Sequence, residues 1–327
     1  MTLRRAFAHV RRRFRRPFRR LFRDGLRPRI VAVAGWSLVF GIAGCQSLAF
    51  GVANFGVAEA DAHAIHDPTH GLALDVYRPE ARTEGPAPVV VFLYGGSWRR
   101  GDRASYRFVG RQLARQGMVA IVADYRTAPR AMFPGFVEDA AGAVAWAKRH
   151  AAEHGGDPAR VFLAGHSAGA QIAALIGTDA RYLAAHGLTP RDLAGVIGLS
   201  GPYDFGIEGY EDVFGPPAQW PRTQPVNFVD GDEPPFLLIH GTADTVVEPV
   251  DSRILADRLR AAGGRAELVW LPEAGHLAPL AALRDPDRQP GMFRAIRTFV
   301  GVPDLRSADL GGPDQSVSEP PVPAGKD

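Results

Sequence analysis

The sequence predicts a doubly wound α/β fold, in which a mostly parallel sheet carries helices on both faces. Three observations support this prediction: short apolar runs recur between residues 72 and 271, turn residues bound them, and helical patterns separate them. Strands of a parallel sheet have such a composition because both of their faces are buried. In folds of this class, ligands bind beyond the carboxyl ends of the strands.

The apolar runs are too short for helices and are rich in Val, Ile, Leu and Phe. The expected strands are Val89–Leu93, Val119–Ala123, Val161–Ala164, Val196–Leu199, Phe236–Ile239 and Leu268–Leu271. Leu72–Tyr77 alternates in polarity and is expected to be an entry strand. A helix is expected from Pro134 to the Gly155-Gly156 pair, and another around Ile254–Ala262, because apolar side chains recur there at helical spacing.

Two segments depart from this alternation. Residues 203–230 contain six aromatic residues and four prolines, which favours either a lid or pocket wall or a packed surface loop. Residues 303–327 are rich in Pro, Gly, Asp and Ser, a composition typical of a disordered tail. The predicted organisation is a signal segment at 1–44, a linker at 45–70, one α/β domain at 71–302 with a short lid or cap insertion, and the tail.

The charge of the chain is divided unevenly. The formal net charge is +3, but residues 1–29 hold twelve arginines and one acid, while the remainder holds 26 basic and 34 acidic side chains. An uncharged stretch follows and extends to Glu59, as in a secretory signal. A lone cysteine excludes a disulfide framework. An arginine-rich nucleic-acid arm and a twin-arginine signal are weaker interpretations, and no nucleic-acid partner is expected.

The lone cysteine ends this apolar stretch. The residues Ile42-Ala43-Gly44-Cys45 resemble the bacterial lipobox, which implies lipidation of Cys45. An uncleaved anchor helix is the alternative. Both interpretations predict a membrane-anchored, extracytoplasmic protein, in the periplasm or at the cell surface, because the arginines remain on the cytoplasmic side.

A candidate nucleophile lies between a predicted strand and a predicted helix. Gly165-His-Ser167-Ala-Gly169 follows the run at Val161–Ala164 and begins a helical pattern. This is the pattern of a nucleophile elbow, whose sharp turn requires small flanking residues and exposes the serine hydroxyl. Ser167 is therefore the expected nucleophile.

A glycine pair follows an earlier strand, at Leu93-Tyr94-Gly95-Gly96-Ser97. Adjacent glycines let backbone N–H groups converge on a developing oxyanion. The expected donors are the N–H groups of Gly96, Ser97 and Ala168. An ordinary Gly-Gly turn is the alternative.

The expected acid and base follow later strands. Asp244 comes after Phe236–Ile239, and His276 comes after Leu268–Leu271, so the chain order is Ser, Asp, His. His240 is the rival base, although its position at a strand end favours a structural hydrogen bond. Asp251 and Glu273 are rival acids, of which Asp251 is interpreted as a helix cap.

Together these motifs resemble the α/β-hydrolase serine esterases. Tyr94-Gly-Gly-Ser-Trp98, Asp124-Tyr-Arg-Thr-Ala-Pro129, Gly156-Asp-Pro-Ala-Arg160 and Gly165-His-Ser-Ala-Gly169 resemble the hormone-sensitive-lipase-like and kynurenine-formamidase-like branch. The Tyr-Gly-Gly-x-Trp form resembles isoprenylcysteine methylesterases, although most relatives carry His where this chain has Tyr94. The resemblance implies hydrolysis of a carboxylic ester of a small molecule through an acyl-enzyme, without cofactor or metal.

Several alternatives remain open. One is a non-catalytic hydrolase-fold binding module, and another is amide or peptide hydrolysis or acyl transfer on the same triad. His63, His66 and His70, with Asp61 and Asp67, have spacings that suit a metal site on a helix, but Pro68 and Gly71 favour a solvated loop. Asp124 and Arg126 are expected to pair beneath the site. The sequence leaves acyl specificity and oligomeric state open.

Overall fold

The computed structural model describes residues 50–80 and 85–302. The predicted signal segment, Cys45 and the predicted tail after residue 302 lie outside the described residues. No described helix combines the length and apolar character needed to cross a bilayer. From Asn54 onward, the described residues belong to one compact unit.

The centre of this unit is an eight-stranded sheet with the order β1-β2-β4-β3-β5-β6-β7-β8. In chain order the strands are β1 (Ala62–Asp67), β2 (Leu72–Tyr77), β3 (Ala87–Leu93), β4 (Val119–Ala123), β5 (Gly156–His166), β6 (Gly195–Leu199), β7 (Phe236–Gly241) and β8 (Ala266–Leu271). The β1–β2 and β2–β4 pairs are antiparallel, and the pairs from β4 through β3 to β8 are parallel. The predicted fold class is confirmed.

Each predicted run lies within an observed strand, and in the central strands burial matches the apolar composition, whereas β8 is buried only at Leu271. Every residue of β3, β4, β6 and β7 is buried. The exception is β1, which lies within the segment interpreted as a linker. That part of the interpretation was wrong: Ala62–Asp67 pairs with β2 at the sheet edge, and its half-exposed side chains form no apolar run.

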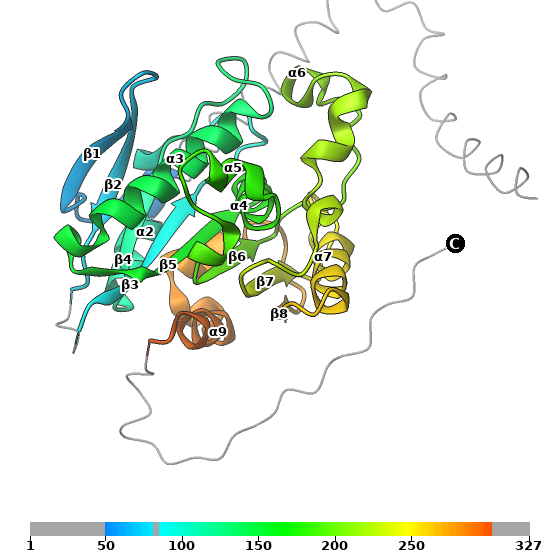
Figure 1. Cartoon of the computed structure of the whole chain (residues 1–327). Helices are drawn as coiled ribbons and strands as arrows, with labels where there is room; N and C mark the ends of the chain where they lie inside the picture. Colours follow the sequence, from blue (N-terminus) through cyan, green and yellow to red (C-terminus); the bar gives the residue numbers. More distant parts are fainter. Residues whose placement is uncertain (1–49, 81–84, 303–327) are drawn as a thin grey trace, which may run out of the picture. The chain divides into compact units, whose positions relative to one another are not determined.

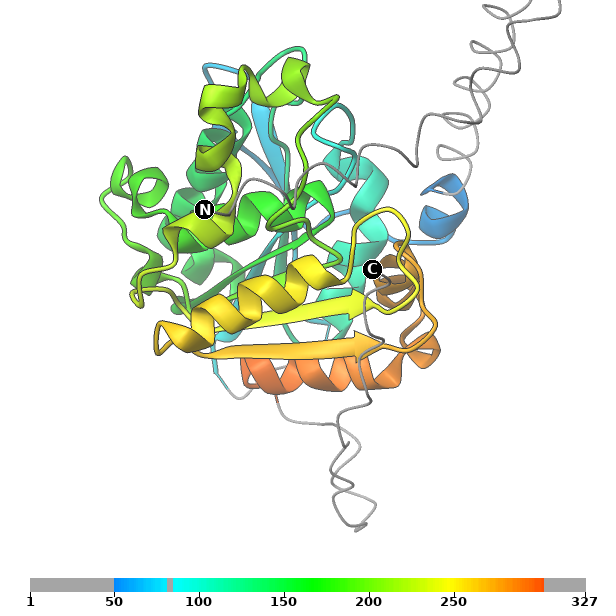
Figure 2. The ribbon, with the colours of Figure 1, turned by 90° about the vertical axis from the view of Figure 1, so that its right-hand side faces the viewer.

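Helices cover both faces of the sheet. They are α2 (Arg107–Arg115), α3 (Gly135–His150), α4 (Ala168–Thr178), α5 (Ala180–Ala184), α6 (Glu211–Phe214), α7 (Val250–Ala261), α8 (Ala278–Arg284) and α9 (Pro290–Val300). Figure 2 shows α7 on one side of β7 and β8 and α9 on the other, and both helices contact these strands.

Short 3-10 helices complete the connections. They are η3 (Arg103–Tyr106), η4 (Ala151–His154), η5 (Pro190–Asp192), η6 (Pro217–Thr223), η7 (Pro225–Phe228) and η8 (Pro286–Arg288). Segment 203–230 contains α6, η6 and η7 and joins β6 to β7. Because the strands from β4 to β8 are parallel, the loops after β3, β5, β7 and β8 emerge at one edge of the sheet, where the candidate residues lie.

Candidate active site

The nucleophile elbow joins β5 to α4. Ser167 has φ 55° and ψ −121°, a strained backbone conformation for a residue with a side chain. A Cβ at Gly165 would lie 2.2 Å from the carbonyl oxygen of Gly169, and a Cβ at Gly169 would lie 2.2 Å from that of Leu93. Only glycine fits at both positions, so the turn that presents Ser167 depends on them.

Three side chains from different loops meet at this turn. The Nε2 of His276 lies 3.0 Å from Ser167 Oγ, and its Nδ1 lies 2.8 Å from Asp244 Oδ2. A carboxylate only accepts hydrogen bonds, so Nδ1 carries the proton and Nε2 is free to accept from the serine hydroxyl. The structure therefore brings together the serine, histidine and aspartate that the sequence singled out.

The carboxylate of Asp244 is buried and surrounded by donors. Its Oδ1 accepts from the backbone N–H groups of Val246 at 2.8 Å and Val247 at 3.0 Å. Burial alone would raise the pKa of Asp244, but hydrogen bonds from His240, His276 and these amides lower it well below its usual range. The group is thus held as a carboxylate, the state that stabilises a positively charged His276.

His166, the residue before Ser167, connects the elbow to the loop that carries His276. His166 is almost fully buried, and its Nε2 donates to the carbonyl oxygen of His276 at 3.0 Å. Burial, with a smaller effect of nearby His276, lowers the pKa of His166 to about 3. His166 therefore remains neutral, and its ring joins the elbow to the loop after β8.

The glycine loop after β3 packs directly on the elbow. A Cβ at Gly95 would lie 3.0 Å from the His166 ring and 3.1 Å from Ser167 Cβ. Gly96 has φ 139°, Ser97 has φ 54° and Trp98 has φ 56°, so the loop follows an unusual left-handed path. Its main chain is held by hydrogen bonds from Arg99 N to Gly96 O at 3.1 Å and from Ala128 N to Trp98 O at 2.8 Å.

The start of α4 supplies the other predicted donor. Ala168 is the first residue of this helix, and N–H groups in a first helical turn have no acceptor within the helix. Ser97 and Ser167 line one cavity. The loop after β3 and the N-terminus of α4 therefore flank Ser167, which is the arrangement that an oxyanion site requires.

A polar network beneath this loop explains the role of the Tyr94 side chain. Tyr94 is 1% exposed; Tyr125 donates its hydroxyl proton to the Tyr94 carbonyl at 2.6 Å, and Tyr125 N donates to the Tyr94 hydroxyl oxygen at 3.3 Å. Burial raises the pKa of Tyr94 well above its usual value, so the phenol stays neutral. At this position the chain has a buried structural side chain rather than an imidazole.

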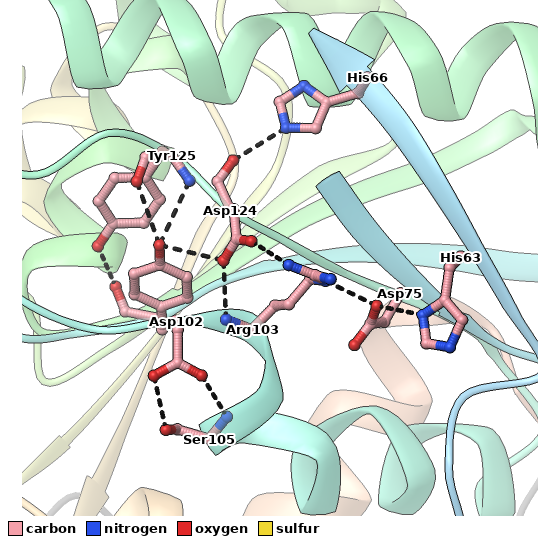
Figure 3. Close-up of polar contacts among 9 residues, drawn as sticks. His63, His66, Asp75, Asp102, Arg103, Ser105, Asp124 and Tyr125 are labelled. Carbon is pink, nitrogen blue, oxygen red and sulfur yellow. Dashed lines mark hydrogen bonds and ion pairs between the residues drawn. The ribbon is translucent and has the colours of Figure 1, made fainter. Parts of the chain in front are cut away.

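Arg103 continues the network and corrects one prediction. Its guanidinium pairs with Asp124 and with Asp75 (2.7 Å to the latter), as Figure 3 shows. The expected pair of Asp124 and Arg126 is absent, because Arg126 instead contacts Asp139 of α3 through two nitrogens, at 2.7 and 2.8 Å. The loop after β3 is thus tied to β2 and to the end of β4.

The predicted histidine cluster belongs to β1 and the turn after it, not to a helix. His63 contacts Asp75 at 2.7 Å, His66 contacts the Asp124 carbonyl at 2.9 Å, and His70 contacts Asp67 at 2.6 Å (Figure 3 shows the first two). Asp67 and His70 approach Asp139, but Asp139 is already neutralised by Arg126. The three imidazoles thus have separate protein partners. The favoured interpretation, a solvated loop, was wrong for His63 and His66, because both lie in β1, which pairs with β2.

The rival acids and base occupy other positions. His240 is fully buried and contacts Ser252 and Asp244 rather than Ser167. Glu273 is exposed. Asp251 does not cap its own helix as expected; its carboxylate accepts from the backbone of Tyr203 at 3.3 Å.

A cavity of about 330 Å³ adjoins Ser167. Segment 203–230 forms part of its wall, with Phe205 and Tyr210 packed against Trp98 at ring-centroid distances of 5.5 and 5.6 Å. A hydrogen bond fixes the Trp98 ring, because its Nε1 donates to Gln171 Oε1 at 3.0 Å. Of the two interpretations of this segment, the structure supports a pocket wall.

The cavity is also acidic. Asp204, Glu248 and Asp251 line it, and among its described lining residues there is neither lysine nor arginine. Burial, with the charges of Asp204 and Glu248, raises the pKa of Asp251 to about 7.

Comparisons with known proteins agree with this geometry. The BD-FAE family model matches residues 74–259, more than half of the chain. The chain belongs to the BD-FAE family. The matched residues of this BD-FAE protein include the elbow, the glycine loop and Asp244, whereas His276 lies beyond them.

Relatives of this BD-FAE chain include esterases. Esterase LipC of Mycobacterium tuberculosis is 33% identical over 231 residues, which cover 62% of this chain and 56% of that protein. A probable isoprenylcysteine alpha-carbonyl methylesterase, ICMEL1 of Arabidopsis thaliana, is 30% identical, with 69% of this chain and 53% of that protein covered. The chain thus spans little more than half the length of these two relatives.

A solved structure covers more of the fold. The Thermogutta terrifontis esterase Est2 is similar with a TM-score of 0.62 and 25% identity, over 75% of this chain and 94% of that one. Another structure, of that organism's esterase 2 phosphorylated by paraoxon, has a TM-score of 0.59 and 27% identity, with 71% of this chain and 94% of that one covered. The resemblance to α/β-hydrolase esterases is therefore confirmed.

Proposed function

We propose that this protein hydrolyses carboxylic esters through an acyl-enzyme on Ser167. The observation that carries the proposal is the continuous hydrogen-bonded chain from Ser167 Oγ through His276 to Asp244, with distances of 3.0 and 2.8 Å. The esterase relatives support the same reaction class.

Each step follows from the position of a side chain. His276 Nε2 takes the serine proton as Ser167 Oγ attacks the ester carbonyl carbon, and Asp244 stabilises the resulting imidazolium. The backbone N–H groups of Gly96, Ser97 and Ala168 stabilise the tetrahedral oxyanion. His276 then returns the proton to the leaving alcohol, and a water molecule activated by the same imidazole releases the acid.

The cavity supports a small, uncharged or cationic substrate. A volume of about 330 Å³ is at the lower end of the range for small-molecule pockets. Three carboxyl groups and the aromatic wall disfavour a substrate with its own carboxylate close to the ester.

Replacement of the nucleophile tests the proposal. Ser167→Ala is expected to lower kcat for p-nitrophenyl acetate and butyrate by about 10⁴-fold or more, because no other group replaces the attacking oxygen. The control is Thr298→Ala, which removes an exposed hydroxyl on α9. Undiminished turnover in a folded Ser167→Ala protein would contradict the proposal.

A fluorophosphonate probe separates the enzyme from its alternatives. A non-catalytic binding module would leave Ser167 unlabelled, whereas a serine hydrolase is labelled and inactivated. Amide hydrolysis and acyl transfer on the same triad are then distinguished by turnover of matched anilides and by product analysis with added alcohols.

We also propose that the enzyme is anchored to a membrane on its extracytoplasmic side. The arginines of residues 1–29, the uncharged stretch and the position of Cys45 support this proposal. Mass spectrometry of the mature N-terminus tests it, with a diacylated Cys45 as the expected result. A soluble cytoplasmic chain that retains Met1 would contradict it.

A further inference from the structure

A second histidine contacts the same carboxylate oxygen as His276. His240 lies in β7 and is fully buried. Its Nε2 is 3.2 Å from Asp244 Oδ2 and 3.3 Å from the carbonyl oxygen of Val247. Its Nδ1 is 2.7 Å from Ser252 Oγ. The proposed reaction uses neither His240 nor Ser252.

The neighbours of His240 determine where its proton lies. Both partners of Nε2, a carboxylate and a backbone carbonyl, can only accept, so Nε2 must carry a hydrogen. In the neutral ring, Nδ1 then accepts the hydroxyl proton of Ser252, which is also fully buried, in the first turn of α7. Ser252 therefore favours the tautomer in which His240 donates to Asp244.

The two oxygens of Asp244 are held differently. Backbone amides of the loop that follows hold Oδ1, at 2.8 and 3.0 Å. Oδ2 accepts from two imidazoles, His276 at 2.8 Å and His240 at 3.2 Å. Because the side chain of Asp244 is fully buried, solvent does not compete with His240 for a hydrogen bond to Oδ2.

We propose that Ser252 and His240 form a positioning relay that orients Asp244 Oδ2 toward His276, so that the hydrogen-bonded chain runs from Ser252 to Ser167. The relay rests on the proposed function, because it acts on the triad and touches no substrate. His240 is a positioning residue that acts through Asp244.

Two substitutions at His240 test the relay. His240→Leu removes the donor, and kcat per fluorophosphonate-titrated site is expected to fall about 10- to 100-fold with KM unchanged, as for loss of one hydrogen bond to a charged group. His240→Gln places an amide N–H near the position of Nε2 and is expected to restore most of this loss. An unchanged kcat in His240→Leu, or no rescue by His240→Gln, would overturn the relay.

A double-mutant cycle separates positioning from general structural support. In an Asp244→Ala background, His240→Leu is expected to cause no further loss of kcat, because its effect passes through the missing carboxylate. A second full loss in that background would overturn the proposal. Should His240→Leu fail to fold, Ser252→Ala provides the same test: kcat is expected to fall about 3- to 10-fold, and an unchanged kcat contradicts the relay.

The outcomes for the relay and for the esterase activity are distinguishable. Unmodified protein that neither labels at Ser167 nor turns over esters would refute the proposed function. Unmodified protein that labels and turns over, with His240→Leu equally active per site, would refute the relay alone.

Discussion

Asp251 is buried in the cavity that Ser167 also lines, where none of the described lining residues is a lysine or arginine. Replacing its carboxyl group should change how the free energy of unfolding depends on pH. The residue is 5% exposed, and burial raises the pKa of its carboxyl group from 3.8 to about 7, with further contributions from Asp204 and Glu248. Asn is nearly the same size, keeps one acceptor for the Tyr203 N–H and cannot ionise.

The sign and size follow from the two pKa values. Below pH 3.8 the carboxyl is protonated in both the folded and unfolded states and contributes no penalty. As pH rises from 3.8 to about 7, the unfolded chain ionises first, so the free energy of unfolding falls. Above pH 7 the loss is complete, and a difference of about 3 pKa units corresponds to ~4 kcal/mol.

Urea unfolding of both proteins at pH 4 and pH 8, followed by circular dichroism, measures this effect. From pH 4 to pH 8, the free energy of unfolding of Asp251→Asn should rise relative to that of the unmodified protein by up to ~4 kcal/mol. The pH 4 measurement is the internal control, because it contains any loss from altered hydrogen bonds. A difference that is the same at both pH values would refute the reasoning.

Three further predictions concern the elbow, the glycine loop and the cavity. Gly169→Ala places a methyl group 2.2 Å from the Leu93 carbonyl oxygen and should lower the free energy of unfolding in urea by about 3 kcal/mol or more. By contrast, the Cβ of Gly142→Ala would lie 3.9 Å from the rings of His66 and His186, so this variant should be neutral or raise stability by up to ~1 kcal/mol. Equal stability of the two variants would contradict the packing argument. Gln171→Leu leaves the buried Trp98 N–H without its acceptor, so it should lower the free energy of unfolding by about 1–3 kcal/mol and reduce kcat for ester hydrolysis. An unchanged kcat would show that Trp98 does not fix the loop after β3. The acidic cavity should lower kcat/KM for mono-p-nitrophenyl succinate about 10-fold relative to p-nitrophenyl butyrate at low salt, and the gap should narrow in high salt. A preference for the succinate would contradict the proposal that the acidic cavity disfavours a substrate with its own carboxylate.

The buried strands could be predicted from the sequence because their burial leaves a direct trace in composition. Val119–Ala123 and Leu72–Tyr77 have the predicted bounds. β1 left no such trace: His63 and Ile65 are exposed at the sheet edge, so only pairing with β2 makes the segment a strand.

Candidate site residues could be predicted from the sequence where a local motif constrains the backbone. Gly165 is required by a close contact within the elbow and Gly169 by the close approach of Leu93 at the end of β3, and the pair of glycines made Ser167 recognisable. Ion pairs between residues far apart in the chain could not be predicted from the sequence. Arg103 pairs with Asp75, 28 positions away, and nothing near Asp124 or Arg126 in the chain indicates that each has a different partner.

The most direct test of the proposed chemistry is to map where an organophosphate reacts. After treatment with paraoxon, peptide mass spectrometry should find one diethylphosphoryl group per chain, on the peptide containing Ser167, with ester hydrolysis lost in proportion. Modification of another residue with turnover lost, or full turnover by protein phosphorylated at Ser167, would contradict the assignment of Ser167 as the nucleophile.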